Sequence, residues 1–352
     1  MFTLLLFALI GEANPAWPEN SFPPVIARPR GALARLDPTR ARDFTEILNQ
    51  VSAALLGKPY QLGPLGEGKF GAEDPDPLYR LDAFDCTTFI ETVMANAYCF
   101  RARAGAERCL SGQMQKIRYG GDQISFRARN HIPELDWLPH NTSRGYLKDL
   151  SASLFPGEWK QASITINRGL WLASRAKDGQ SKGELPPAAK NRELAFLPVS
   201  YFFAKAELKP GEKIALEDKL GATRKEIAAK LAAPGVSEEV KDDLARDKFR
   251  AEMEFLKAVY IPLEDRLREI PSGTILNLLR GPPPDPAEAA LTTLIAHQGL
   301  ILQLSDGAHI RQAAPTSGHV GDQRLGTYLL RYLRSVNFRG VSLFQILPAK
   351  SE

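Results

Sequence analysis

The chain has 352 residues, of which 44% are hydrophobic and 24% are charged, and its formal net charge is +4. These fractions are ordinary for a globular protein, and the 27 Gly and 26 Pro favour an α+β enzyme with many turns over a helical bundle. The sequence has no run of Lys and Arg of the kind that follows phosphates, so nucleic acid is disfavoured as a partner. The length fits two domains or one large domain with insertions.

The N-terminus begins with an apolar run, Phe2–Ile10, which is followed by small residues. This run is too short to span a bilayer as a helix, and nothing else in the chain approaches that length. It is typical of the hydrophobic region of a secretory signal peptide, although no Lys or Arg precedes it. We therefore predict a signal peptide over residues 1–16 and an exported protein of the periplasm or cell envelope, with no stable membrane insertion after its removal. The alternative is a buried N-terminal strand or helix.

Two helices are predicted in the first third of the chain. Residues 41–56 place apolar side chains at helical spacing before Gly57, which is a typical helix stop. Residues 57–84 are rich in Gly, Pro and Asp and read as a long loop, and such a loop inside a domain is usually functional. Asp85 is a good N-cap residue, so Cys86 occupies the first position of the next helix, which carries an apolar stripe.

The second half of the chain contains the strand candidates, each short, β-branched or aliphatic, and bounded by Gly or Pro. They are Ser163–Asn167, Phe196–Phe202, Thr274–Leu279, Leu294–Leu304, Ala308–Ala313 and Val341–Leu347. Between them, from about residue 205 to about residue 265, a charged segment is predicted to form a helical insertion whose charges face solvent. The Gly and Pro residues at 281–290 predict a rigid loop.

The three cysteines are Cys86, Cys99 and Cys109. In an exported protein an odd number leaves one thiol over, and such a thiol is a candidate reactive group. Cys99 and Cys109 flank a short segment and could form a disulfide that leaves Cys86 free; the alternative is that all three are reduced. No Cys-x-x-Cys motif occurs and the five His do not pair at ligand spacing, so we expect neither a metal site nor a cofactor.

The position of Cys86 suits a catalytic thiol. A thiolate is the form that attacks an amide, and a helix N-terminus and a neighbouring imidazolium both lower the pKa of a thiol from its usual value of about 8.5. The free amides of the first helical turn also suit a developing oxyanion, which the amide of Cys86 itself could bind. The alternative is a buried, inert cysteine, which is the commoner case where nothing else indicates a site.

Three segments together carry a resemblance to a known family. They are Tyr60–Glu67, Leu81–Glu91 and Arg129–Trp137. The set resembles the N-acetylmuramoyl-L-alanine amidase-like family of the NlpC-type cell-wall hydrolases, which are papain-like cysteine peptidases. Thr87-Thr88 stand where Ser-Gly is usual in the NlpC type, and a helical insertion interrupts the match. The resemblance implies an α+β fold, an antiparallel sheet with the Cys86 helix packed on it, and a single catalytic domain over residues 17–352.

The same resemblance implies a catalytic base and a residue that orients it. Ala296–Leu302 is similar to the His-x-Gly strand of these relatives, which makes His297 the base for Cys86. One strand later, Gln312 occupies the place of the polar residue that orients the imidazole, and its amide oxygen can accept the ring N–H. His309 is the alternative orienting residue if the register shifts.

Five further residues are expected to contact substrate, namely Tyr60, Asp85, Asp136, Trp137 and Asn141. Tyr60 lies near the cysteine in the relatives, where it orients substrate or supports the oxyanion; the alternative is a core aromatic. Trp137 suits the face of a sugar ring, while Asp136 and Asn141 suit hydroxyls or amides. Burial of Trp137 in the core is the alternative reading of that pair.

These residues and the resemblance predict a monomeric, cysteine-dependent amidohydrolase that acts on peptidoglycan fragments or muropeptides. The resemblance implies cleavage of the amide between N-acetylmuramic acid, in its intact or anhydro form, and L-alanine. A D-glutamyl endopeptidase of the stem peptide is the first alternative, because it uses the same thiol chemistry. A non-catalytic wall-binding protein on a degenerate enzyme fold is the alternative from another class. The mildly basic net charge suits an anionic partner such as peptidoglycan.

Overall fold

The computed structural model describes residues 43–68, 71, 73–102, 106–121, 123–175, 189–281 and 291–348. The predicted signal peptide over residues 1–16 lies outside this part of the chain, as does the predicted rigid loop apart from its first residue. Within the described residues, no helix combines the length and the apolar composition that crossing a bilayer requires.

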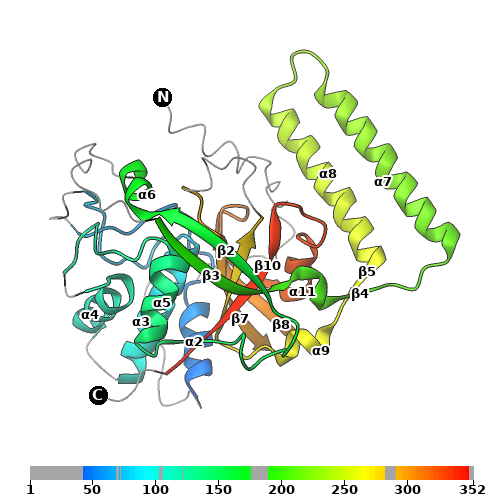
Figure 1. The fold of residues 1–352 in the computed structure, drawn as a ribbon. Helices are drawn as coiled ribbons and strands as arrows, with labels where there is room; N and C mark the ends of the chain where they lie inside the picture. The colour runs from blue at the N-terminus through cyan, green and yellow to red at the C-terminus, as the bar shows by residue number, and fades with distance from the viewer. Residues whose placement is uncertain are drawn as a thin grey trace.

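An antiparallel sheet forms the centre of the fold (Figure 1). Its strands are β1 (Leu147–Asp149), β2 (Lys160–Asn167), β3 (Ala189–Pro198), β6 (Thr274–Arg280), β7 (Ile295–Leu304), β8 (Gly307–Ala314), β9 (His319–Arg324) and β10 (Phe338–Ile346). The spatial order is β2-β3-β10-β6-β7-β8-β9, and β1 pairs with the end of β10. All neighbouring pairs among these described strands are antiparallel. The prediction of an α+β fold built on an antiparallel sheet is therefore confirmed.

The strand predictions differ from the structure at Phe196–Phe202, and they omit β1, β9 and two short strands, Phe203–Lys205 and Tyr260–Pro262. The predicted strand Phe196–Phe202 ends at Pro198, and Val199–Phe202 forms a short 3-10 helix, η4. Strand β9 is not predicted, because its first residue, His319, follows a glycine and looks like part of a turn in the sequence. The other five predicted strands are present with bounds that differ by a few residues.

Helices cover one face of the sheet and connect it to the long loop. They are α2 (Phe44–Ala53), α3 (Cys86–Ala102), α4 (Ala106–Arg118), the π-helix η3 (Pro133–Trp137), α5 (Leu138–Ser143) and, after β2, α6 (Arg168–Arg175). Both predicted N-terminal helices are present, and Gly57 follows the first with a left-handed φ of 79°. On β7, Leu300 and Leu302 pack in the core shared with α2 and α3, whereas Ile301 packs in the core on the opposite face.

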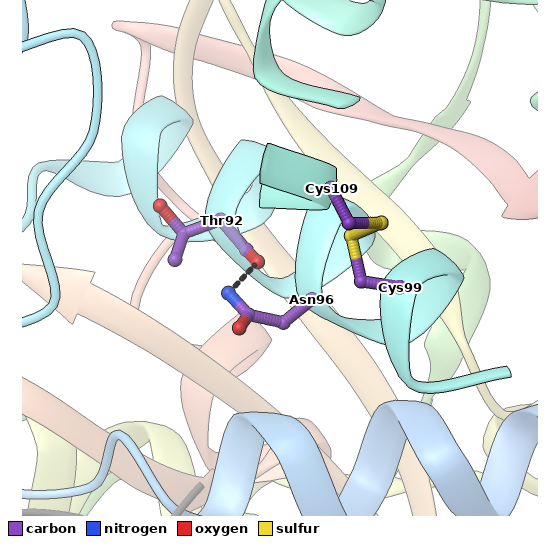
Figure 2. The surroundings of a disulfide bond; sticks show 4 residues. All are labelled: Thr92, Asn96, Cys99 and Cys109. Atoms are coloured by element: carbon purple, nitrogen blue, oxygen red, sulfur yellow. Dashed lines mark hydrogen bonds between the residues drawn. A yellow bond between two sulfur atoms is a disulfide. The ribbon is translucent and has the colours of Figure 1, made fainter. Parts of the chain in front are cut away.

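A disulfide joins Cys99, near the end of α3, to Cys109 in α4 (Figure 2). In the preceding turn of α3, the side-chain amide of Asn96 donates to the carbonyl oxygen of Thr92 at 2.8 Å. The bridge fixes the C-terminal end of α3 against α4 and leaves Cys86, at the N-terminal end of α3, as the free cysteine. The sequence left both the bridged and the reduced alternative open, and the structure has the bridged one.

The opposite face of the sheet carries a second core and a helical hairpin. The elements are η4, β4 (Phe203–Lys205), α7 (Pro210–Leu231), α8 (Glu238–Val259), β5 (Tyr260–Pro262), α9 (Glu264–Glu269) and α11 (Leu325–Leu330). Residues of η4, α9 and α11 pack on this face of the sheet. Helices α7 and α8 extend away from the sheet as a hairpin whose base is the β4–β5 pair (Figure 1). An apolar cluster that includes Leu330 packs the hairpin on α11.

Candidate active site

The N-terminus of α3 is fixed by Asp85, as its N-cap position predicts. One carboxylate oxygen of Asp85 accepts the backbone N–H of Thr88 at 2.8 Å and its hydroxyl at 2.7 Å. The other oxygen accepts the backbone N–H of Gly63 in the long loop at 3.0 Å. These bonds give Asp85 a role in capping and loop anchoring, and its predicted contact with substrate stays a prediction. The cap leaves Cys86 at the first helical position.

The surroundings of Cys86 favour the neutral thiol. Burial raises the pKa of Cys86 to about 11, and the negative charge of Asp85 acts in the same direction. Hydrogen bonding by the backbone amide of Gln298 and by Thr87 favours the thiolate, with a smaller effect on the pKa. Burial and the negative charge of the capping carboxylate thus outweigh the hydrogen bonds that favour the thiolate of Cys86.

His297 is held by Gln312 on the adjacent strand. The Nε2 atom of His297 lies 2.6 Å from the side-chain oxygen of Gln312. An amide oxygen can only accept, so Nε2 carries the proton and Nδ1 keeps a free lone pair. Burial lowers the pKa of His297 to about 4, and the positive charge of Arg331 acts in the same direction. The imidazole is therefore neutral at physiological pH and can act as a base at Nδ1.

The register of the strands explains why Gln312 rather than His309 reaches the imidazole. A Cβ atom at Gly299 would lie 2.5 Å from Cδ1 of Ile310 and 3.4 Å from Cβ of Gln312. The missing side chain at Gly299 thus lets residues of β8 pack closely beside His297. The ring of His309 instead bonds the carboxylate of Asp306 at 3.0 Å.

Hydrogen bonds join the start of α3 to Gln298 on β7, the strand that carries His297. The hydroxyl of Thr87, next to Cys86, donates to the side-chain oxygen of Gln298 at 2.8 Å, across 211 residues of sequence. The backbone amide of Gln298 hydrogen-bonds Cys86 itself. The structure thus brings the start of α3 to the residue that follows His297, and Thr87 and Gln298 are site residues that the sequence analysis missed.

Tyr60 also lies at this end of α3. It forms a bridge to Phe84, and the backbone N–H of Gln61 donates to the carbonyl oxygen of Phe84 at 2.9 Å. Burial raises the pKa of Tyr60, and the negative charge of Asp85 acts in the same direction, so its hydroxyl stays protonated as a donor. This location is compatible with the predicted role of Tyr60 beside the nucleophile.

Trp137 and Asn141 lie behind the site and not in it. Both side chains have no exposed surface (0%), which leaves no ring face for a sugar. The indole N–H of Trp137 donates to Glu91 on α3 at 3.0 Å, and Asn141 donates to the carbonyl oxygen of Trp137 at 2.9 Å. Asp136 pairs with Arg168 at 2.9 Å. We therefore assign Trp137 and Asn141 to the packing that supports α3, and their burial does not support a contact with substrate, whereas the predicted contact of Asp136 stays a prediction.

Ionic contacts explain why the segments 60–67 and 129–137 occur together. Arg129 donates to Glu67 at 2.7 Å and to Asp74 at 2.9 Å, and both partners belong to the long loop. Glu91 pairs with Arg118 at 3.0 Å in the interior, where burial raises the pKa of Glu91 to about 7. The long loop is thus tied to the layer that supports α3.

Glu134 is a second group that the sequence analysis missed. Its side chain is fully buried, and its carboxylate accepts the backbone N–H groups of Leu294 and Ile295 at the start of β7. Burial raises the pKa of Glu134 to about 7, against the opposing effect of these amides. Glu134 therefore anchors the strand that carries His297. Among the described residues, no group of three or more His, Cys, Asp or Glu side chains could hold a metal ion.

Comparisons with known proteins identify a family and similar folds. A family model described as AmiA-like, N-acetylmuramoyl-L-alanine amidase-like, matches residues 50–225, which is half of the chain. A solved structure from Legionella pneumophila has 23% identity and a TM-score of 0.63, covering 87% of this chain and 90% of its own. An N-acetylmuramoyl-L-alanine amidase from Bacteroides uniformis has 16% identity and a TM-score of 0.51, covering 86% and 98%. No curated protein matches the chain.

Proposed function

The chain belongs to the AmiA-like, N-acetylmuramoyl-L-alanine amidase-like family, and from this premise we propose that it is a cysteine-dependent peptidoglycan amidohydrolase. Family membership indicates a hydrolase whose substrate is peptidoglycan. The finer proposal is that the enzyme cuts the amide between N-acetylmuramic acid and L-alanine, with a papain-like, NlpC-type arrangement of Cys86, His297 and Gln312. The contact that supports it best is the 2.6 Å bond between His297 and Gln312, which leaves Nδ1 free as a base.

The proposed reaction begins from a neutral thiol and a neutral imidazole. The sulfur of Cys86 attacks the carbonyl carbon while its proton passes to Nδ1 of His297. The imidazolium then donates this proton to the leaving nitrogen of L-alanine, the C–N bond breaks, and a thioester remains on Cys86. Water, deprotonated by His297, attacks the thioester, and the acid product and the thiol are released. Gln312 keeps the ring oriented through both proton transfers.

The oxyanion that forms in each step has a donor at the start of α3. Amides of the first helical turn have no partner within the helix, and Asp85 takes that of Thr88. The backbone N–H of Cys86 is therefore the proposed first donor, and the hydroxyl of Tyr60 is the proposed second. Removing one such donor typically costs about 10²-fold or more in kcat.

Turnover of defined muropeptides, with and without the anhydro form, tests this proposal. Mass spectrometry of the products distinguishes release of L-alanine-linked peptide from cleavage within the stem peptide, which is the endopeptidase alternative. Cys86→Ala and His297→Ala are expected to abolish turnover, whereas His309→Ala, a matched histidine on the neighbouring strand, is expected to retain it. Turnover by Cys86→Ala, or binding without turnover by the wild type, would contradict the proposed chemistry.

The disulfide supports a proposed location outside the cytoplasm. Disulfides persist in oxidising compartments and are rare in the cytosol, and Cys99 and Cys109 form one. The apolar run Phe2–Ile10 provides a candidate export signal. We accordingly propose export to the periplasm or cell envelope, which fractionation of cells that express the full chain tests directly.

A further inference from the structure

A row of polar side chains crosses the sheet beneath the start of α3. Gln298 on β7 accepts the hydroxyl of Thr87 at 2.8 Å and donates its own amide to Asn277 on β6 at 2.7 Å. Asn277 is the register partner of Gln298 on one side and of Ser342 on β10 on the other. All three strand residues are at most 1% exposed.

This row is costly for a sheet whose neighbouring positions are apolar. On the same face of β7, the next two positions are Leu300 and Leu302, which pack in the core shared with α2 and α3. Burying an amide costs free energy unless it is hydrogen-bonded. Among the described residues, the nitrogen of Asn277 and the hydroxyl of Ser342 lack a hydrogen-bond partner. An apolar row would pack here without unsatisfied groups, so stability alone does not account for the polar one.

The row includes the residue that follows His297 in the chain, and it is hydrogen-bonded to the residue that follows Cys86. Thr87 follows Cys86 in the chain, and Gln298 follows His297, so one hydrogen bond joins the neighbours of the two residues. We propose that Gln298 is a positioning residue, which holds Cys86 at reacting distance from His297 through Thr87, and that Asn277 fixes the amide of Gln298 in the required orientation. This inference rests on the proposed function.

The proposed reaction requires that the distance between Cys86 and His297 be fixed by contacts between distant parts of the chain. The nucleophile belongs to a helix and the base to a strand 211 residues away, and nothing local in the sequence sets their separation. A misplacement of about 1 Å between reacting groups can cost about 10²-fold in rate. The capping by Asp85 fixes the start of α3 against the loop, whereas the Thr87–Gln298 bond fixes it against the strand of the base.

The test compares Thr87→Val, which removes the hydroxyl at constant shape, with Thr87→Ser, which keeps it. Steady-state turnover of a muropeptide and the rate of alkylation of Cys86 by iodoacetamide are measured, together with thermal unfolding. We expect Thr87→Val to lower kcat by roughly 10- to 100-fold with KM changed by about twofold or less, and to slow alkylation. Thr87→Ser is expected to recover most of the loss.

A matched control lies on the same strand. The amide of Gln303 makes two hydrogen bonds, to the carbonyl oxygens of Leu267 and Ile270, away from Cys86. Gln303→Met is expected to lower the unfolding temperature without changing kcat, while Gln298→Met lowers kcat. If Thr87→Val and Gln298→Met keep the wild-type kcat while Cys86→Ala is inactive, the positioning role is wrong and the proposed function stands. If Cys86→Ala turns over substrate, the proposed function is wrong.

Discussion

The protonation state of Cys86 gives the sharpest prediction about this site. With a pKa of about 11 for the thiol and about 4 for His297, moving the proton from sulfur to nitrogen costs roughly 10 kcal/mol. A charge pair at about 4 Å recovers roughly 4 kcal/mol. The neutral pair is therefore favoured by several kcal/mol, and in the proposed reaction the thiol proton leaves only as the attack occurs.

Alkylation of Cys86 by iodoacetamide across pH measures this state, because Cys86 is the free cysteine of the three. We expect the rate to rise about tenfold per pH unit through neutral pH, since only about one thiol in 10⁴ is ionised at pH 7. The pH profile of kcat/KM should lose activity as the pH falls through about 4, where His297 becomes protonated. Alkylation that is independent of pH from about 5 to about 8 indicates a preformed ion pair and refutes the reasoning.

Three further predictions concern stability. Gly340→Ala directs a methyl group into the carbonyl oxygen of Leu197, so we expect a loss of roughly 1–3 kcal/mol in the free energy of unfolding, measured in urea; unchanged stability contradicts the tight β3–β10 contact. Glu134 has a folded-state pKa of about 7, above its unfolded value of 4.5, so it stabilises the fold at low pH and this contribution is lost as the pH rises from about 4.5 through 7. The melting temperature of Glu134→Gln should accordingly change less with pH over that range than the melting temperature of the wild type. An equal pH dependence in the two proteins refutes the raised pKa of Glu134. Replacing both Cys99 and Cys109 by Ala should lower the free energy of unfolding by about 2.7 kcal/mol, because the bridge closes a loop with a sequence separation of 10. A urea midpoint of unfolding equal to that of the oxidised wild type contradicts this prediction.

The parts of the site that depend on local chemistry could be predicted from the sequence. The cap at Asp85 involves a residue three positions away, so the start of α3 at Cys86 follows from the order of side chains alone. The composition of the segment also predicts strand β7, which contains Gly299. The pairing of His297 with Gln312 comes from the resemblance to relatives, and the structure has the two side chains 2.6 Å apart.

The parts that depend on burial and on distant contacts could not be predicted. Trp137 looks equally suited to a sugar and to a core, and only its packing against Glu91 decides between them. The pKa of Cys86 follows from desolvation, which a helix position does not reveal. The Thr87–Gln298 bond joins residues with no pattern in common, because strand alternation constrains which face a side chain takes but not its partner.

In the sequence, the hairpin of α7 and α8 lies between the two residues of the proposed catalytic pair. Cys86 precedes it and His297 follows it, yet its ends return together at the β4–β5 pair while its tip, residues 232–237, is almost entirely exposed and far from the sheet (Figure 1). A cut at the tip would yield one fragment with Cys86 and another with His297. The β3–β10 and β1–β10 pairings join those fragments in one sheet. We therefore expect a chain that is cut at the tip to keep Cys86 and His297 in one folded unit, and this turn is a suitable place to attach a label, a tether or a second protein.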